Sequence, residues 1–262
     1  MTEPDRVVVV TGASKGIGRA IAAELAGART ALVVSARGAA ELERAAADLR
    51  PRAAAVEAVV ADVSTPDGAR APVERALATF GRIDVLVNNA GGGPIRPLLE
   101  LTDDDWQAGL ALNFLSAVRG AAAATPAMIA GGGGSIINVA SSVAREPDAL
   151  FGPYGAAKAA LVNYTKALAN ATAQHGIRAN CITPGIVDTE GSRAVGEESA
   201  RVTGRTVDEI MAAMLRKHPI PLGRIGRVEE IAGLVGYLVS DRAAWITGSV
   251  FTIDGGAQHA AW

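Results

Sequence analysis

Two side chains four residues apart, Tyr154 and Lys158, form the pair in this sequence best suited to move a proton. They begin an alanine-rich stretch predicted to be helical over 154–175, so both face one side of the helix, one turn apart. A tyrosine with its ordinary pKa near ~10 is a poor base at neutral pH. A neighbouring ammonium lowers that pKa, so the phenol can donate a proton to a carbonyl oxygen or accept one from an alcohol. The spacing alone is common on helix surfaces, but Tyr164 and Tyr237 have no lysine four residues later.

A serine offers a third group for the same chemistry. Ser141 directly follows a predicted strand, 135–140, at the sheet edge where α/β proteins bind ligands. Its hydroxyl would hold a substrate oxygen without acting as a nucleophile, because no G-x-S-x-G elbow surrounds it. The adjacent Ser142 fits the spacing equally well.

A glycine-rich turn near the amino terminus predicts a phosphate-binding site. It lies between a predicted strand, 6–10, and a predicted helix, 18–28, and reads G-x-x-x-G-x-G. Three glycines at such a turn allow the backbone to approach a pyrophosphate at the helix N-terminus. The pattern is unspecific by itself, and an ordinary strand-to-helix turn is the alternative. We expect the cofactor to contact Gly12, Ser14, Lys15, Gly16, Ile17 and Gly18.

The end of the second predicted strand, 30–35, indicates which cofactor binds. NAD-binding proteins usually place a carboxylate there for the ribose 2′-hydroxyl. Here the strand ends in Ser35-Ala36-Arg37 without Asp or Glu, and Lys15 can reach the same corner. Two cations favour a 2′-phosphate, so the prediction is NADP(H) rather than NAD(H). Two solvated surface cations are the alternative.

Two further turns are expected to border the cofactor. Asp62 and Val63 follow the third predicted strand, 56–61, where the carboxylate is placed to contact the adenine edge; a helix N-cap role for Asp62 is an equal alternative. Asn88, Asn89, Ala90 and Gly91 follow the fourth predicted strand, 83–88. They are predicted to support the cofactor ribose, with a purely structural turn as the alternative.

Strand and helix patterns alternate along almost the whole chain. Continuous Val, Ile and Leu runs indicate strands covered on both faces, and strand–helix repetition gives a parallel, doubly wound sheet. The prediction is a single Rossmann-like α/β domain over 1–262 with about seven strands and helices on both faces. The remaining strands are expected at 178–182 and 249–253, and the remaining helices at 39–49, 65–80, 103–130, 206–217 and 228–240.

One segment, 190–217, breaks the pattern because it is polar and rich in glycine and charge. Long insertions in compact domains are usually functional lids or disordered segments. We predict a mobile substrate lid whose second half, 206–215, is helical.

Composition excludes several classes of protein. Hydrophobic residues make up 49% of 262, enough for a large core. A balance of 25 Lys and Arg against 27 Asp and Glu provides no basic surface for nucleic acid. The single cysteine and three scattered histidines predict neither disulfide nor metal site. No stretch reaches the ~18 apolar residues of a membrane span, and the amino terminus does not resemble a secretory leader, so a cytoplasmic location is expected.

Together these motifs resemble the short-chain dehydrogenase/reductase family in its compact form. The family's T-G-x-x-x-G-x-G matches Thr11 to Gly18, its N-N-A-G matches Asn88 to Gly91, and its Y-x-x-x-K matches Tyr154 to Lys158. The usual spacing between serine and tyrosine in the family selects Ser141 over Ser142. The family's catalytic asparagine corresponds to Asn113, and its P-G motif corresponds to Pro184-Gly185.

The resemblance implies a catalytic tetrad of Asn113, Ser141, Tyr154 and Lys158. Tyr154 would be the general acid in ketone reduction and the base in the reverse reaction. Ser141 would orient the carbonyl, and Lys158 would hold the nicotinamide ribose and lower the pKa of Tyr154. Asn113 would position a water that relays protons to Lys158. The segment after the P-G motif would lie near the nicotinamide carboxamide through Ile186, Val187 and Thr189.

The leading hypothesis is an NADPH-dependent carbonyl reductase acting on a small ketone, of the 3-oxoacyl thioester or biosynthetic ketoreductase type. An NAD-dependent polyol or sugar-alcohol dehydrogenase is the alternative, and a non-catalytic nucleotide-binding scaffold is a weaker one. Charged residues at 145–148 would recognise a polar substrate or be solvated.

The family resemblance also implies a homodimer or homotetramer formed through the helices at 103–130 and 154–175. Their small-residue faces would pack between subunits or against the sheet: Ala117, Ala121, Ala124, Ala157, Ala160 and Ala167.

Overall fold

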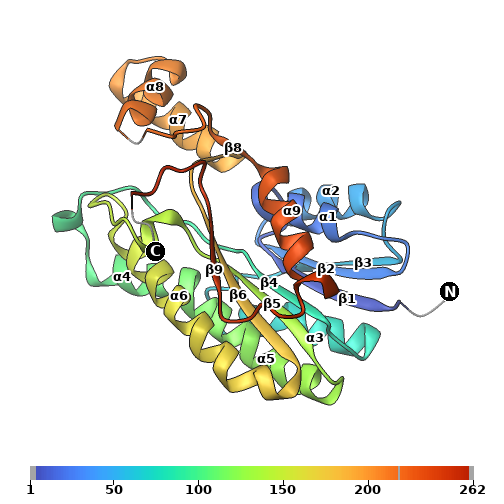
Figure 1. Cartoon of the computed structure of the whole chain (residues 1–262). Helices are drawn as coiled ribbons and strands as arrows, with labels where there is room; N and C mark the ends of the chain where they lie inside the picture. The colour runs from blue at the N-terminus through green and yellow to red at the C-terminus, as the bar shows by residue number, and fades with distance from the viewer. Residues whose placement is uncertain (1–3, 218, 260–262) are drawn as a thin grey trace.

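The apolar runs of the sequence form one parallel sheet. The computed structural model describes residues 4–217 and 219–259, and within them seven strands are ordered β3-β2-β1-β4-β5-β6-β9 (Figure 1). They are β1 (Arg6–Thr11), β2 (Thr30–Ala36), β3 (Ala55–Val60), β4 (Val85–Asn88), β5 (Gly134–Val139), β6 (Ile177–Pro184) and β9 (Val250–Ile253). The predicted doubly wound parallel sheet is confirmed. The strand order reverses between β1 and β4, the switch point at which such sheets bind ligands.

Alternate residues of each strand face opposite helix layers. In β1, Val8 and Val10 belong to one buried cluster, and Val7 and Val9 belong to the other. This alternation follows from the two-residue period of a strand, and it explains why strands covered on both faces are continuously apolar. The first layer contains α1 (Gly16–Leu25), α2 (Ala39–Leu49) and α9 (Val228–Leu238). The second contains α3 (Pro66–Phe80), α5 (Ser116–Ala130) and α6 (Gly152–Thr172).

Local signals set where several helices begin. Thr65 caps α3 by accepting a hydrogen bond from the Gly68 amide at 3.1 Å, and Pro66 occupies the first turn. Thr102 and Asp105 form a reciprocal capping box at the start of α4 (Asp103–Leu110). These caps satisfy backbone donors that have no acceptor inside the helix.

The predicted helix over 103–130 is interrupted in its middle. A π-helical turn, η2 (Ala111–Leu115), joins α4 to α5 and contains Asn113. Such turns insert an extra residue into a helix and often lie at functional sites. Sequence periodicity did not predict this interruption, because the chain stays helical on both sides of it.

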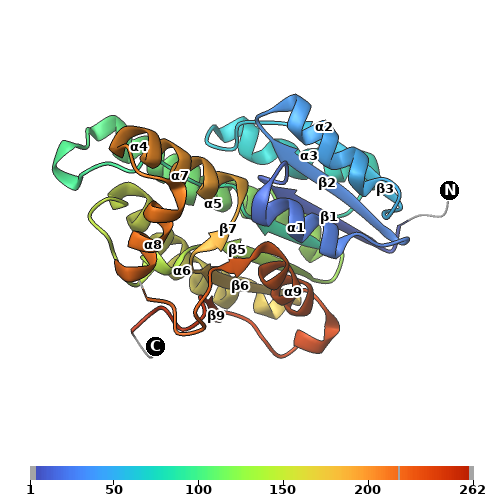
Figure 2. The ribbon, with the colours of Figure 1, turned by 90° about the horizontal axis from the view of Figure 1, so that it is seen from above.

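The segment predicted to be an irregular lid is mostly helical. It forms α7 (Glu190–Thr203) and α8 (Val207–Lys217), so only the expectation for its second half matches the structure. Just before α7, β7 (Val187–Asp188) pairs with β8 (Gly226–Arg227). Figures 1 and 2 show α7 and α8 beyond the carboxyl ends of the strands, outside the two helix layers. Closure of this segment over a substrate stays a prediction.

The small residues expected to pack between subunits mostly pack within the chain. Ala117, Ala121, Ala124 and Ala157 are at most 2% exposed, so their side chains fill the core of this chain. Ala160 is half-buried and Ala167 is exposed. The alternative of burial against the sheet therefore holds for the four buried alanines.

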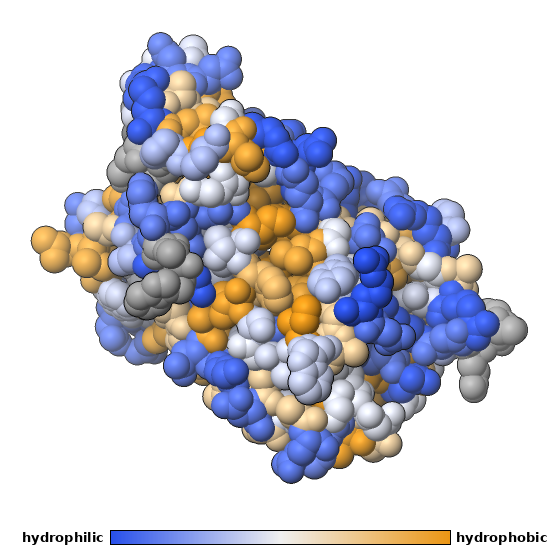
Figure 3. Space-filling view, in the orientation of Figure 1, coloured by the Kyte–Doolittle hydropathy of each residue, from blue (hydrophilic) through white to orange (hydrophobic). Residues whose placement is uncertain are grey.

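An incompletely covered edge strand lies on the opposite side of the sheet from β3. Each residue of β9 is half-buried or exposed, and Figure 3 shows apolar residues gathered near the middle of the face where Figure 1 places this strand. Trp245, in the loop that leads to β9, is fully exposed. Among the residues that the structure describes, no helix combines the length and apolar character needed to cross a membrane.

Candidate active site

A cavity of about 490 Å³ opens at the switch point, at the carboxyl ends of β1 and β4. Its walls come from the turn after β1, the turns after β2 and β3, the segment after β4, and the start of α6. Eighteen of the residues predicted to be functional line it: Gly12, Ser14, Lys15, Gly16, Ile17, Gly18, Arg37, Asp62, Val63, Asn89, Ala90, Gly91, Ser141, Tyr154, Lys158, Pro184, Gly185 and Thr189.

The turn between β1 and α1 has the backbone shape that its glycines predict. Gly16 has φ +55°, in the left-handed region that disfavours side chains. A Cβ on Gly18 would lie 2.3 Å from the Gly12 carbonyl oxygen, so only glycine fits there. Gly16, Ile17 and Gly18 line the cavity at the start of α1, where the positive end of the helix favours an anion.

Polar bonds hold the turn after β4 against the phosphate turn. Asn89 Nδ2 donates to the carbonyl oxygens of Thr11 at 2.9 Å and Gly12 at 3.2 Å. In return, Thr11 Oγ1 accepts from the amides of Asn89 at 3.0 Å and Ala90 at 3.1 Å. The Asn89 side chain therefore fixes the cavity wall, which is the structural role left open for it. Thr11 was expected only as the first residue of the glycine-rich motif, but its hydroxyl joins the end of β1 to the turn after β4.

The two predicted cations and two carboxylates lie at one end of the cavity, opposite the end formed by Ser141, Tyr154 and Lys158. Lys15 and Arg37 line this end together with Asp62 and Glu41. Glu41, in the first turn of α2, was missed because a carboxylate was sought only at the end of the strand. Hydrogen bonds from Ser64 hold the pKa of Asp62 below its ordinary value, and Arg37 adds a smaller effect in the same direction.

Asp62 is not the N-cap of the following helix. The cap is Thr65, and Asp62 Oδ1 instead accepts from Ser64 N at 3.0 Å and Ser64 Oγ at 2.7 Å, in the turn before α3. Its carboxylate nevertheless lines the cavity, so an adenine contact stays a prediction.

The reacting groups meet where β5 ends and α6 begins. Ser141 follows β5 and lines the cavity beside Tyr154. Ser142 starts a 3₁₀ turn, and its carbonyl oxygen accepts from Gln258 Nε2 at 2.8 Å. The cavity wall includes Ser141 and omits Ser142, and the catalytic role of Ser141 stays a prediction.

Burial sets the proton affinity of the tyrosine. Loss of water raises the pKa of the Tyr154 phenol, and hydrogen bonding with Ser141 lowers it by less. Lys158 was expected to lower this pKa, but it does not contribute to the shift. The Tyr154 phenol thus stays protonated at neutral pH in the free protein, which suits proton donation.

Lys158 is the buried cation of the site. It is 2% exposed, and its Nζ donates to the Val139 carbonyl oxygen at 2.7 Å. Its Nζ also lies 5.6 Å from the centre of the Tyr154 ring. Burial lowers the pKa of Lys158 to about 8, with a small opposing effect from the Cys181 thiol.

Asn113 lies behind the cavity wall and does not line it. Its Oδ1 accepts from Gly92 N at 2.8 Å, and its Nδ2 donates to the carbonyl oxygens of Gly92 at 2.8 Å and Gly109 at 3.0 Å. A Cβ on Gly91 would lie 2.8 Å from Asn113 Oδ1 and 3.0 Å from Lys158 Nζ. The π-turn therefore brings the asparagine next to the lysine, while its amide holds the Gly91–Gly92 backbone. The water relay stays a prediction.

A chain of buried polar side chains joins three of the elements that carry the site. Asn88 Nδ2 donates to Asn138 Oδ1, and Asn138 Nδ2 donates to Thr165 Oγ1, each at 2.9 Å. These bonds link β4, β5 and α6. Asn138 was not predicted, although an asparagine within an apolar strand is a signal for such a buried network.

The segment after β6 divides between the cavity and the core. Thr189 faces the cavity and caps α7, where its Oγ1 accepts from Ser192 N at 3.0 Å. Val187 is 7% exposed and packs in the core, so its side chain does not reach the cavity. A contact of its backbone with a cofactor stays a prediction.

The fold is that of a Rossmann-like α/β protein, and its cavity lies at the switch point, where such sheets bind ligands. The family model described as short chain dehydrogenase matches residues 6–200. The chain is 35% identical over 252 residues to the 3-oxoacyl-(acyl-carrier-protein) reductase of Escherichia coli strain K12, covering 96% of each. Its structure resembles L-sorbose reductase from Gluconobacter frateurii complexed with NADPH and L-sorbose, with TM-score 0.93, 36% identity and 98% of each chain covered. It also resembles 7α-hydroxysteroid dehydrogenase complexed with NADH and 7-oxo glycochenodeoxycholic acid, with TM-score 0.87, 28% identity and coverage of 98% and 96%.

The chain therefore belongs to the short-chain dehydrogenase family and is an oxidoreductase.

Proposed function

We propose that the protein reduces a ketone with NADPH and oxidises the corresponding secondary alcohol in the reverse direction. The observation that carries this proposal is the meeting of Ser141, Tyr154 and Lys158 at one end of a cavity whose other end presents Lys15 and Arg37. The reacting groups and the cations thus lie where the two ends of one extended dinucleotide would be held.

The residues present fit such a cofactor. The Gly12–Gly18 turn lines the cavity at a helix N-terminus, which suits the diphosphate. Gly91, Tyr154 and Lys158 line the cavity where the ribose next to the nicotinamide would lie. Lys15 and Arg37 suit a 2′-phosphate. When bound, the nicotinamide supplies the hydride for reduction or accepts it in oxidation.

Each reacting residue has a distinct role in this proposal. Tyr154 donates the proton to the carbonyl oxygen, and its raised pKa keeps that proton in place until the substrate arrives. Ser141 donates a hydrogen bond that orients the same oxygen. Lys158 binds the ribose hydroxyls, and Asn113 fixes the Gly91–Gly92 wall beside them.

A second candidate, an NAD-dependent polyol or sugar-alcohol dehydrogenase, is favoured by one observation. Glu41 lines the cavity at the end where Arg37 lies, and a carboxylate there suits a ribose 2′-hydroxyl.

Both L-sorbose and 7-oxo steroid appear in the structures that this fold resembles, so the substrate class proposed is a small ketone or its alcohol. A 3-oxoacyl thioester is the candidate supported by the similarity to the acyl-carrier-protein reductase.

We also propose that the protein is a cytoplasmic homo-oligomer. The incompletely covered edge strand β9 and the exposed Trp245 support self-association through that face, and exposed Ala167 leaves part of α6 open to a partner.

The proposed reaction is tested by following oxidation of NADPH and of NADH with a ketose, a 3-oxoacyl thioester and a cyclic ketone. We expect turnover of at least one ketone, faster with NADPH. Binding of NADPH without turnover of any ketone or alcohol, in a protein as inactive as its Tyr154→Phe variant, would support the non-catalytic scaffold instead.

A further inference from the structure

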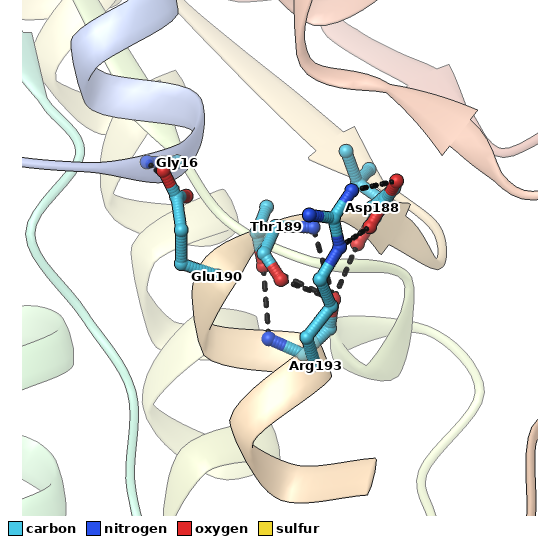
Figure 4. A network of polar contacts seen from close by, with 7 residues as sticks. Gly16, Asp188, Thr189, Glu190 and Arg193 are labelled. Atoms are coloured by element: carbon cyan, nitrogen blue, oxygen red, sulfur yellow. Dashed lines mark hydrogen bonds and ion pairs between the residues drawn. The ribbon is translucent and has the colours of Figure 1, made fainter. Parts of the chain in front are cut away.

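The first residue of α7 contacts the phosphate turn. Glu190 Oε2 accepts a hydrogen bond from the Gly16 amide at 3.0 Å, and its Oε1 lies 4.0 Å from Arg19 Nη1. Figure 4 shows the Glu190 side chain extending from the start of α7 to Gly16, at the start of α1. The contact joins residues separated by 174 positions.

The start of α1 has an open place for a negative group. Lys15 occupies the N-cap position without a side-chain cap, and the first turn contains no acidic residue. Helix N-termini carry unpaired amides and a partial positive charge. The Glu190 carboxylate supplies the missing acceptor, so α7 caps a helix to which it does not belong.

Other bonds hold Glu190 toward this turn. The Thr189–Ser192 capping box fixes the first turn of α7, and Arg193 pairs with Asp188 through two bonds of 2.7 Å and 2.6 Å (Figure 4). Gly16 also packs against Thr189, because a Cβ on Gly16 would lie 3.4 Å from the Thr189 methyl carbon. The position of the carboxylate is therefore built into the start of the lid.

The same amides are those that a dinucleotide needs. Gly16 lines both the proposed cofactor cavity and a second cavity, and Glu190 reaches the Gly16 amide from the second one. A diphosphate would be drawn to the N-terminus of α1 for the reason that draws the carboxylate. One amide cannot serve both anions fully, and two anions at one helix end repel each other.

We propose that Glu190 competes with the cofactor's diphosphate for the Gly16 amide, and that dinucleotide binding releases the carboxylate and loosens α7. The inference rests on the proposed function and deepens it, because it makes Glu190 a determinant of cofactor affinity. A second cavity of about 480 Å³ adjoins the contact and is lined by Glu190, Arg19 and Arg193. The released carboxylate thus has room beside Arg19, while Arg193 stays paired with Asp188.

The test compares two probes. ADP carries the diphosphate, whereas 2′-AMP carries a phosphate only at the other end of the nucleotide. Calorimetric titration of Glu190→Ala should show ADP affinity about fivefold tighter than wild type, the size of one charge effect at a helix terminus, with 2′-AMP affinity unchanged. Glu190→Gln, which keeps an acceptor but loses the charge, should give an intermediate gain.

Glu229→Gln is the matched control. Glu229 lines the same second cavity from the first turn of α9, so its loss removes equal charge without touching Gly16. It should leave ADP affinity close to wild type. Equal or weaker binding of ADP to Glu190→Ala, or an equal gain in Glu229→Gln, would overturn the proposal.

Hydrogen exchange of the backbone over 190–203 gives a second readout. In wild type, ADP should speed exchange in α7, and 2′-AMP should not. In Glu190→Ala, exchange should already be fast and should not respond to ADP. A wild-type α7 that does not respond to ADP would contradict the release. Failure of wild type and variants to bind NADPH, ADP or 2′-AMP would instead refute the cofactor site, and with it the proposed function.

Discussion

Lys158 lies one helical turn beyond Tyr154, with its Nζ 5.6 Å from the centre of the tyrosine ring and its proton donated to the Val139 carbonyl oxygen. The ammonium is buried without an ion pair among the described residues, so burial lowers the pKa of Lys158 to about 8. Burial raises the pKa of Tyr154 at the same time. The free protein thus places a protonated phenol beside a buried lysine whose charged form is destabilised by burial.

Removing the phenol oxygen should stop the chemistry and spare binding. Tyr154→Phe is expected to lower kcat for ketone reduction by at least about 100-fold, the range for loss of a general acid, with little change in NADPH affinity. Tyr164→Phe is the matched control, because Tyr164 lies on the same helix and packs edge-on against Phe114, away from the cavity lining. Steady-state kinetics and a fluorescence titration of each variant check this; a large loss of NADPH binding in Tyr154→Phe would contradict the role.

The two adjacent serines should differ sharply. Ser141→Ala is expected to reduce kcat by about 100-fold, as for loss of one donor to a developing oxyanion, since Ser141 lines the cavity. Ser142→Ala should retain turnover close to wild type, because Ser142 acts through its backbone carbonyl toward Gln258. The comparison is made with the same ketone under saturating NADPH. Similar losses of kcat in both variants would show that turnover depends on the conformation of the loop rather than on the Ser141 hydroxyl.

Burial of Lys158 predicts how stability depends on pH. Its pKa is about 8 in the folded chain and near ~10.4 when unfolded, so between these values the unfolded state binds more protons and stability rises with pH. Wild type should therefore gain stability relative to Lys158→Met from about pH 8 to about pH 10, at up to about 1.4 kcal/mol per pH unit. Urea unfolding of both proteins measures the difference, in which other titrating groups largely cancel. A gap that stays constant with pH would mean that the lysine is not perturbed in the free protein.

The fold was predicted well where one physical cause sets both the sequence pattern and the structure, as it does for the strands. Continuous apolar runs occur because each strand is covered on both faces, as Val7 and Val8 show by pointing into different clusters. The start of α7 was missed because its composition is polar, although Thr189 and Ser192 form a capping box that the sequence already contained.

Other features depend on tertiary contacts, which a local sequence pattern does not predict. The π-turn at Asn113 interrupts a stretch that is helical on both sides of it. The Glu190–Gly16 bond joins distant parts of the chain. Glu41 was a missed local signal, because the first turn of a helix after β2 can present a carboxylate as readily as the strand end itself.

The choice of cofactor is the central claim, and a side-by-side fluorescence titration of wild type and Arg37→Ala with NADPH and NADH tests it most directly. Arg44→Ala, an exposed cation of the same helix region, is the control. Wild type should prefer NADPH by tenfold or more, and Arg37→Ala should lose ~1.5 to 3 kcal/mol of NADPH affinity while binding NADH almost unchanged. Comparable or tighter NADH binding by wild type would contradict the account, and would point to Glu41 and an NAD-dependent alcohol dehydrogenase.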